Sequence, residues 1–209
     1  MDTRNKAEKF WDKKSNYFDR EERKDDLTNI KIIEKTRNRL KTSDIVLDYG
    51  CGTGTAAIEI ASIVNKVKGI DVSSKMIEAA KGKTAEREVK NIDFAQTTIF
   101  DEKLKKESFD GILSFYLLHL VEDTPKVMQR INELLKPGGL FISATPCMGE
   151  SFLQRIFISL FGKMIRIPYL KFFKIQELKG LMTDGNFEIV ETECLRQRGQ
   201  QYFIVAKKI

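Results

Sequence analysis

The stretch that decides the fold is Ile45-Val46-Leu47-Asp48-Tyr49-Gly50-Cys51-Gly52-Thr53-Gly54-Thr55, an apolar strand that runs directly into three alternating glycines. The next residues, 56–64, have the composition of a helix. Glycine reaches backbone angles that other residues avoid, and it lets the main chain approach a ligand without a Cβ in the way. The first amide groups of the helix point toward a ligand above the glycines. The pattern therefore predicts a cofactor site.

A second strand supports this prediction. Residues 67–72 are mostly apolar and place an acid, Asp71, twenty-one residues after Gly50. An acid about 20 residues beyond the glycine turn is where a βαβ nucleotide site places its ribose acceptor. The turn itself fails the G-x-G-x-x-G pattern of nicotinamide enzymes, because Thr55 stands at its last position.

Strands and helices alternate along the middle of the chain. Strands are expected near 45–49, 67–71, 92–96, 109–114 and 139–145, and helices at about 55–64, 74–88 and 123–135. Two further helices are predicted at 5–18 and 27–40, and an antiparallel C-terminal hairpin at 187–195 and 201–206. This order predicts an α/β fold with a doubly wound, mostly parallel sheet.

Several segments in family order are similar to known enzymes. Residues 47–54 resemble the first motif of the class I S-adenosylmethionine-dependent methyltransferases, and 69–73 with Met76 and 79–81 resemble the second. Residues 108–112 and 118–123 resemble the fourth strand and the loop after it, and 134–140 the turn into the fifth strand. The chain is similar to the small-molecule branch that includes the ubiquinone and menaquinone biosynthesis methyltransferases. The resemblance covers roughly residues 40–146 and implies a seven-stranded, Rossmann-like methyltransferase sheet.

The resemblance also implies a cofactor, S-adenosylmethionine, with S-adenosylhomocysteine as product. The predicted contacts at its methionine end come from the glycine turn and the fourth strand: Asp48, Gly50, Cys51, Gly52, Gly54, Ser114 and Phe115. Asp48 would position the turn or the ammonium group. Ser114 and Phe115 would lie near the transferred methyl.

At the other end of the cofactor, Asp71 would accept both ribose hydroxyls through its two oxygens. Its alternative role is to cap the helix that follows Val72. Val72 and Met76 would pack on the adenine, although either could belong to the core. Where relatives often carry an acid for the adenine amino group, this chain has Thr98, so we expect recognition through its hydroxyl and the main chain near Ile99.

Two more side chains are candidates. Tyr17 lies in a segment that resembles the family's entry segment, and it is either a lid residue over the sulfonium or an ordinary packed aromatic. His119 is the only histidine and the natural candidate for a general base, with a structural role in the loop as the alternative.

The predicted organisation is a single methyltransferase domain over residues 1–209, with N-terminal cap helices in 1–40 and a lid-like insertion at 149–173. Apolar residues of the insertion recur at helical spacing. They fit a lid, a helix packed on its own core, or a basic amphipathic helix in peripheral contact with a membrane.

Composition limits the partners. The net charge is +6, but basic residues are interleaved with acids, which argues against a nucleic-acid partner. Three scattered cysteines and an N-terminus without an apolar signal segment predict a cytoplasmic protein. We predict no metal site, and the sequence assigns no oligomeric state.

The predicted function is methyl transfer from S-adenosylmethionine to a small hydrophobic or aromatic acceptor by in-line displacement. The alternatives are a nucleic-acid or protein methyltransferase and a non-catalytic S-adenosylmethionine-binding module. The sequence does not identify the acceptor.

Overall fold

A computed structural model of the protein describes residues 3–22, 26–150, 168–197 and 200–209. Within these residues seven strands form one sheet in the order β3-β2-β1-β4-β5-β7-β6. They are β1 (Ile45–Tyr49), β2 (Lys66–Asp71), β3 (Ile92–Gln96), β4 (Phe109–Phe115), β5 (Leu135–Pro146), β6 (Phe187–Arg196) and β7 (Gln201–Lys208). The first five strands are parallel, and β7 runs antiparallel to both of its neighbours. The predicted fold class and the C-terminal hairpin are confirmed.

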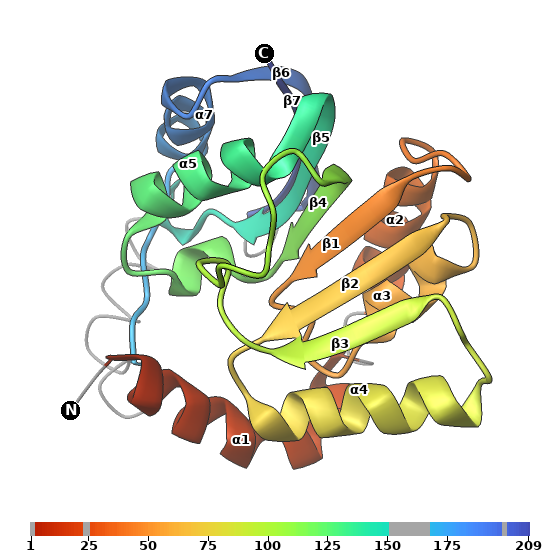
Figure 1. The fold of residues 1–209 in the computed structure, drawn as a ribbon. Helices are drawn as coiled ribbons and strands as arrows, with labels where there is room; N and C mark the ends of the chain where they lie inside the picture. Colours follow the sequence, from red (N-terminus) through yellow and green to blue (C-terminus); the bar gives the residue numbers. More distant parts are fainter. Residues whose placement is uncertain (1–2, 23–25, 151–167, 198–199) are drawn as a thin grey trace.

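Helices cover both faces of the sheet (Figure 1). They are α1 (Thr3–Glu22), α2 (Asp26–Arg37), α3 (Thr55–Ala61), α4 (Ser74–Glu86), α5 (Thr124–Leu134) and α7 (Ile175–Asp184), with short 3₁₀ turns η2 (Leu118–Leu120) and η3 (Met148–Glu150). One buried core joins the sheet to α2, α3 and α4, and the other joins it to α5 and α7. No helix in the described ranges is both long and apolar enough to cross a bilayer.

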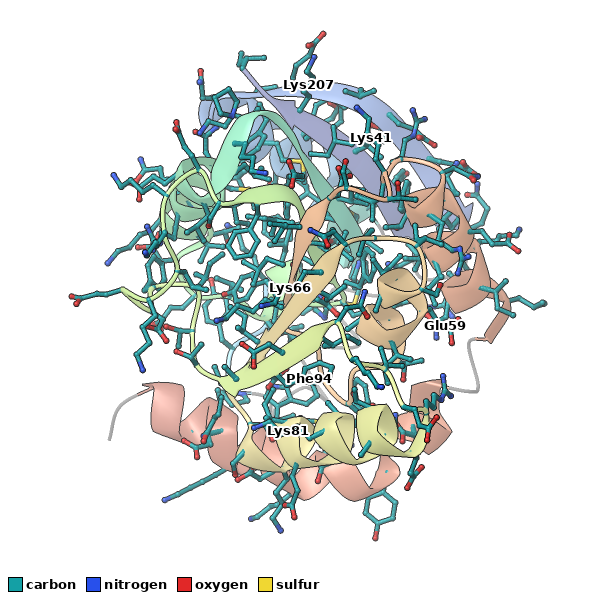
Figure 2. All side chains as sticks on the ribbon, turned by 45° about the vertical axis from the view of Figure 1, so that its right-hand side comes forward. Lys41, Glu59, Lys66, Lys81, Phe94 and Lys207 are labelled. Atoms are coloured by element: carbon teal, nitrogen blue, oxygen red, sulfur yellow. The ribbon has the colours of Figure 1, made fainter. Side chains whose placement is uncertain are left out.

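The central strands are apolar because helices cover them on both sides. Val46, Leu47 and Asp48 of β1 are all at most 2% exposed, which is the pattern of a strand inside a parallel sheet. Phe94 of β3 fills the space between the sheet and α4 (Figure 2). A Cβ on Gly69 of β2 would lie 2.4 Å from the Phe94 ring, so this packing requires glycine there.

The lysines labelled in Figure 2 come from four separate places in the fold, namely Lys41, Lys66, Lys81 and Lys207, and all four are exposed. They do not share one helix or one strand. Basic side chains are thus exposed on at least these four separate parts of the fold.

The fifth strand begins four residues earlier than predicted, at Leu135. A register shift between Phe109 and Gly111 of β4 lets the Lys136-Pro137-Gly138-Gly139 segment stay in the sheet. The Lys136 ammonium lies 2.8 Å from the Asp110 carboxylate and holds this irregular part of the ladder together.

The site is placed by the strand order. From β1 the chain continues outward to β2 and β3, and then returns to β4 on the other side of β1. The helices on either side of this reversal pack on opposite faces, which leaves a crevice at the carboxyl ends of β1 and β4. The glycine turn follows β1 at this end.

Candidate cofactor and acceptor site

The glycine turn is held against β2. The amides of Gly50 and Cys51 both donate to the Ile70 carbonyl, at 2.8 and 3.1 Å. Gly50 and Gly52 have φ angles of +77° and +52°, which side chains disfavour. Burial raises the pKa of the Cys51 thiol, so this residue is a neutral part of the wall.

Asp71 stands beside this turn. One carboxylate oxygen accepts from the Gly52 amide at 3.1 Å and the other from the Ser73 amide at 2.9 Å. Burial raises the pKa of the Asp71 carboxyl, while the two amide donors act in the opposite direction. Each oxygen retains lone-pair capacity for a ligand hydroxyl. Capping of α4 is performed by Ser73, whose hydroxyl accepts from the Met76 amide at 3.2 Å, so that alternative role of Asp71 is taken by its neighbour.

A cavity of about 610 Å³ opens above these residues. Of the predicted site residues, ten line it: Asp48, Gly50, Cys51, Gly52, Asp71, Val72, Met76, Thr98, Phe115 and His119. The structure thus brings the glycine turn, the acid of β2, the end of β4 and the only histidine to one space. A volume of this size is within the ordinary range for small-molecule sites.

Four predicted residues do not line the cavity, and each has a physical reason. A Cβ on Gly54 would lie 2.8 Å from the Phe94 ring, so this glycine serves packing rather than the ligand. Ile99 and Ser114 are fully buried in the protein interior and do not line the cavity. Tyr17 is 52% exposed, because neighbouring helical residues point in directions about 100° apart. Phe18 takes the place at the cavity that was predicted for Tyr17.

The N-terminal helix supplies cavity residues that the sequence analysis missed. Ala7, Trp11 and Phe18 of α1 line the cavity, and they form one stripe at helical spacing. A Cβ on Gly52 would lie 3.2 Å from the Phe18 ring, so this ring covers the turn directly. Asp12 fastens α1 to the start of α4, since its carboxylate accepts from the Ser73 hydroxyl at 2.6 Å.

Tyr116 is a further residue that the sequence analysis missed. It follows β4 with a φ angle of +54°, a strained conformation for a side chain of this size. Its amide donates to the Ala144 carbonyl at 2.7 Å, and its hydroxyl donates to Asn29 Oδ1 of α2 at 3.0 Å. Tyr116 and Asn29 both line the cavity. The Tyr116 hydroxyl and the Asn29 amide thus add a polar pair to this part of the cavity wall.

Another part of the wall comes from the segment after η3. Pro168 and Tyr169 line the cavity, and the Lys171 amide donates to the His119 carbonyl at 2.7 Å. The Gly149 amide donates to the Phe173 carbonyl at 2.8 Å, so the two ends of the predicted insertion meet. Most of that insertion, residues 151–167, lies outside the described residues.

A family model described as a methyltransferase domain matches residues 40–202, most of the chain. The chain belongs to this family. The match confirms the predicted membership of the class I S-adenosylmethionine-dependent methyltransferases. The cofactor of this family is S-adenosylmethionine.

Individual relatives match the chain at low identity or over only part of its length. Demethylmenaquinone methyltransferase of Lactococcus lactis is 38% identical over 97 residues, which are 45% of this chain and 38% of the relative. An O-methyltransferase of Pyrenophora dematioidea is 28% identical over 177 residues, 82% of this chain and 65% of the relative. This methyltransferase domain thus spans less than two thirds of either relative. The crystal structure of the YcgJ protein of Bacillus subtilis has a TM-score of 0.72 at 17% identity, covers 85% of this chain and 97% of its own, and shares the fold.

The lining of the methyltransferase domain fits this cofactor. Asp71 presents a half-buried carboxylate whose oxygens are oriented by main-chain amides, as a pair of ribose hydroxyls requires. Val72 and Met76 lie next to it and offer apolar surface for a flat base. The glycine turn brings the main chain close to the cavity's side chains, because a Cβ would lie 3.2 Å from the Phe18 ring at Gly52 and 2.7 Å from Leu117 at Gly50.

His119, which also lines the cavity, differs from Asp71 because its side chain is an uncharged imidazole. Burial lowers the pKa of its imidazole to about 4, so the ring is neutral at physiological pH. Its Nδ1 atom is buried and has no hydrogen-bond partner among the described residues. A neutral imidazole can accept a proton or a hydrogen bond from a bound molecule.

Proposed function

We propose that the protein transfers the methyl group of S-adenosylmethionine to a small hydrophobic or aromatic acceptor by in-line displacement. One observation carries the proposal: a single cavity contains both the carboxylate of Asp71 with the glycine turn and the neutral His119 with aromatic neighbours. A cofactor held at the first group leaves the second end of the cavity for an acceptor.

In this proposal the chain binds and orients its two ligands. Asp71 accepts the ribose hydroxyls, and the main chain from Gly50 to Gly52 contacts the methionine portion, with Asp48 beneath it. Val72, Met76 and Thr98 surround the adenine. S-adenosylmethionine supplies an activated methyl group, so the protein needs mainly to align the reactants, an effect worth up to about 7–11 kcal/mol.

The cavity is also rich in aromatic and aliphatic side chains. Phe115, Tyr116, Tyr169 and Ile33 all line it. Burial of apolar surface is the main source of affinity that such walls offer, which favours a hydrophobic or aromatic molecule. The names of two relatives, a quinone-pathway methyltransferase and an O-methyltransferase, support the same class of acceptor.

His119 is the proposed general base where the acceptor must lose a proton. Its ring lines the cavity and its Nδ1 has no hydrogen-bond partner among the described residues, whereas the lowered pKa makes it a weak base, so a bound acceptor must raise the pKa of the ring for this role. An acceptor that is already a good nucleophile needs no base, so the contribution of His119 depends on the acceptor.

The test is a methyl-transfer assay with labelled S-adenosylmethionine against phenols, quinols and small amines, with S-adenosylhomocysteine formation as the readout. Transfer to one of these classes supports the proposal. Methyl transfer only to RNA, DNA or a protein would contradict the proposed small-molecule acceptor and support a nucleic-acid or protein methyltransferase. Tight binding of the cofactor with no turnover on any acceptor would instead support a binding module. Phe18 and His119 variants then separate cofactor binding from acceptor activation.

A cytoplasmic location and peripheral contact of 149–173 with a membrane stay predictions. Flotation of the full chain with anionic and neutral vesicles tests the second, because a basic amphipathic segment should prefer anionic lipid.

A further inference from the structure

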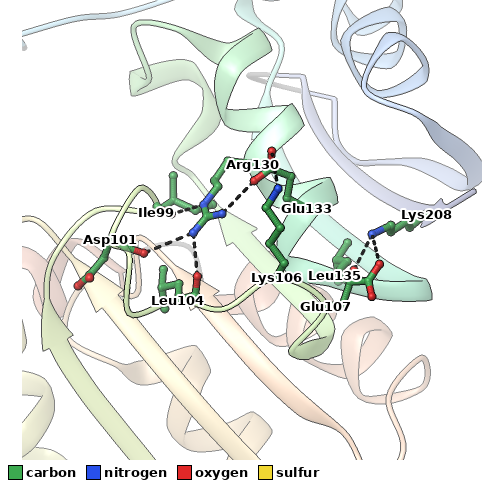
Figure 3. Close-up of polar contacts among 9 residues, drawn as sticks. All are labelled: Ile99, Asp101, Leu104, Lys106, Glu107, Arg130, Glu133, Leu135 and Lys208. Carbon is green, nitrogen blue, oxygen red and sulfur yellow. Dashed lines mark hydrogen bonds and ion pairs between the residues drawn. The ribbon is translucent and has the colours of Figure 1, made fainter.

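An arginine of α5 holds the loop that follows β3. Arg130 Nε donates to the Ile99 carbonyl at 3.1 Å, and its Nη2 donates to the carbonyls of Asp101 and Leu104 at 3.4 and 2.8 Å (Figure 3). Its side chain is 15% exposed. A guanidinium presents its donors in a fixed planar fork, so three carbonyls that converge on it are fixed relative to one another.

The other side of this loop is a wall of the cavity. Thr97, Thr98 and Phe100 line the cavity, and Phe100 lies between Ile99 and Asp101, two of the residues whose carbonyls Arg130 binds. One helical turn before Arg130, the Lys126 ammonium lies 5.2 Å from the centre of the Phe100 ring. Two side chains of α5 thus hold the loop: Arg130 binds its main-chain carbonyls, and Lys126 contacts the Phe100 ring.

The guanidinium is itself oriented. Its Nη1 lies 2.9 Å from a Glu133 carboxylate oxygen, on the side away from the loop. Lys106 reaches the same carboxylate from the opposite direction, at 3.6 Å. Because the Glu133 carboxylate binds Nη1, the Nε and Nη2 groups of Arg130 point toward the loop carbonyls. Hydrogen bonds from a charged donor are the stronger ones in proteins, which suits a contact that shapes a loop.

We propose that Arg130 is a positioning residue for the cofactor. It keeps the 97–104 loop in the shape that accepts the adenine end, and it touches neither reactant. The identity of that cofactor rests on the proposed function, whereas the effect on the loop does not. A loop that spends part of its time in other shapes lowers apparent affinity in proportion to the competent fraction.

The experiment compares Arg130→Met with Lys208→Met. Lys208 is a matched control, because its ammonium also donates to a carbonyl, that of Leu135 at 2.8 Å, but on a part of the fold away from the cavity (Figure 3). We expect Arg130→Met to raise the Kd for S-adenosylhomocysteine and the KM for S-adenosylmethionine at least about tenfold, because the variant loses all three hydrogen bonds to the loop and one hydrogen bond from a charged donor is already of that order. The kcat at saturating cofactor should stay within about twofold, and Lys208→Met should leave all three values unchanged.

Arg130→Lys keeps the charge without the fork and should fall between the wild type and Arg130→Met. It also serves as the second variant if Arg130→Met does not fold. Unchanged cofactor affinity in both Arg130 variants overturns the proposal. Equal weakening by Lys208→Met overturns it as well, because the effect would then be general loss of stability.

Hydrogen exchange separates this proposal from the cofactor assignment. In the wild type the Asp101 and Leu104 amides donate to the Thr98 and Asp101 carbonyls, at 3.1 and 3.0 Å. Their exchange should accelerate in Arg130→Met, and not in Lys208→Met, without any ligand present. Unchanged exchange overturns the positioning role. A wild type that fails to bind S-adenosylhomocysteine, but shows this acceleration in the variant, overturns the proposed function alone.

Discussion

Acidification should unfold this protein through His119, and replacement of that residue should remove the effect. Burial lowers the pKa of the folded imidazole from 6.5 to about 4. Below pH 6.5 the unfolded chain therefore takes up a proton that the folded protein refuses, so the stability due to this group is complete above pH 6.5 and falls as the pH approaches 4. At 1.36 kcal/mol per pH unit, the loss between pH 7.5 and 4.5 is about 2–3 kcal/mol.

The assay is urea unfolding of the wild type and His119→Asn at pH 7.5, 6.0 and 4.5. Other groups, including the carboxyl of Asp71, titrate in both proteins, so the difference between the two isolates the histidine. The wild type should lose about 2–3 kcal/mol more than the variant over this range. Parallel loss in both proteins would refute the reasoning, because His119 would then titrate near 6.5 in the folded state and could not be a buried neutral imidazole.

Two further predictions concern packing around the cofactor. Phe18→Ala should raise the Kd for S-adenosylhomocysteine about tenfold, or ~1.4 kcal/mol, measured by calorimetry, because the ring covers the glycine turn; equal weakening by the exposed neighbour, Tyr17→Ala, would contradict this. Gly54→Ala should lower the free energy of unfolding in urea by about 1–3 kcal/mol, since the new methyl would meet the Phe94 ring at 2.8 Å; a variant as stable as the wild type would show that Phe94 yields without strain.

The sheet and the glycine turn were predictable because their signals are local. Each parallel strand is covered on both faces and so appears as a short apolar run between helices, as β1 does. The hairpin of β6 and β7 is likewise marked by two β-rich runs with a short polar connection. The early start of β5 was missed, because it depends on a register shift in β4 that only the neighbouring strand creates.

Cavity residues were less predictable, because several of them come from elements that pack onto the site from far away in the sequence. Trp11 and Asn29 reach it only through the docking of α1 and α2. Phe18 lines the cavity and Tyr17, the predicted candidate, does not, because one position along a helix turns a side chain by about 100°. Gly54 belongs to the glycine pattern by spacing, but its neighbours show that it makes room for Phe94.

The positioning residue Arg130 left no signal in the sequence. An arginine on the polar side of an amphipathic helix ordinarily faces solvent, and only the path of the 97–104 loop brings three carbonyls to it. Contacts of this kind depend on main-chain atoms, which every residue carries, so residue identity alone does not announce them.

The central claim is that Asp71 and the glycine turn form an S-adenosylmethionine site. Calorimetric titration of the wild type and Asp71→Asn with S-adenosylhomocysteine, and with NAD as the competing nucleotide, tests it most directly. We predict one S-adenosylhomocysteine bound per wild-type chain, no heat from NAD, and an affinity at least about tenfold lower in Asp71→Asn, whose neutral amide loses the charge-assisted bonds to the ribose. Binding of NAD without S-adenosylhomocysteine, or equal affinity in both proteins, would contradict the assignment.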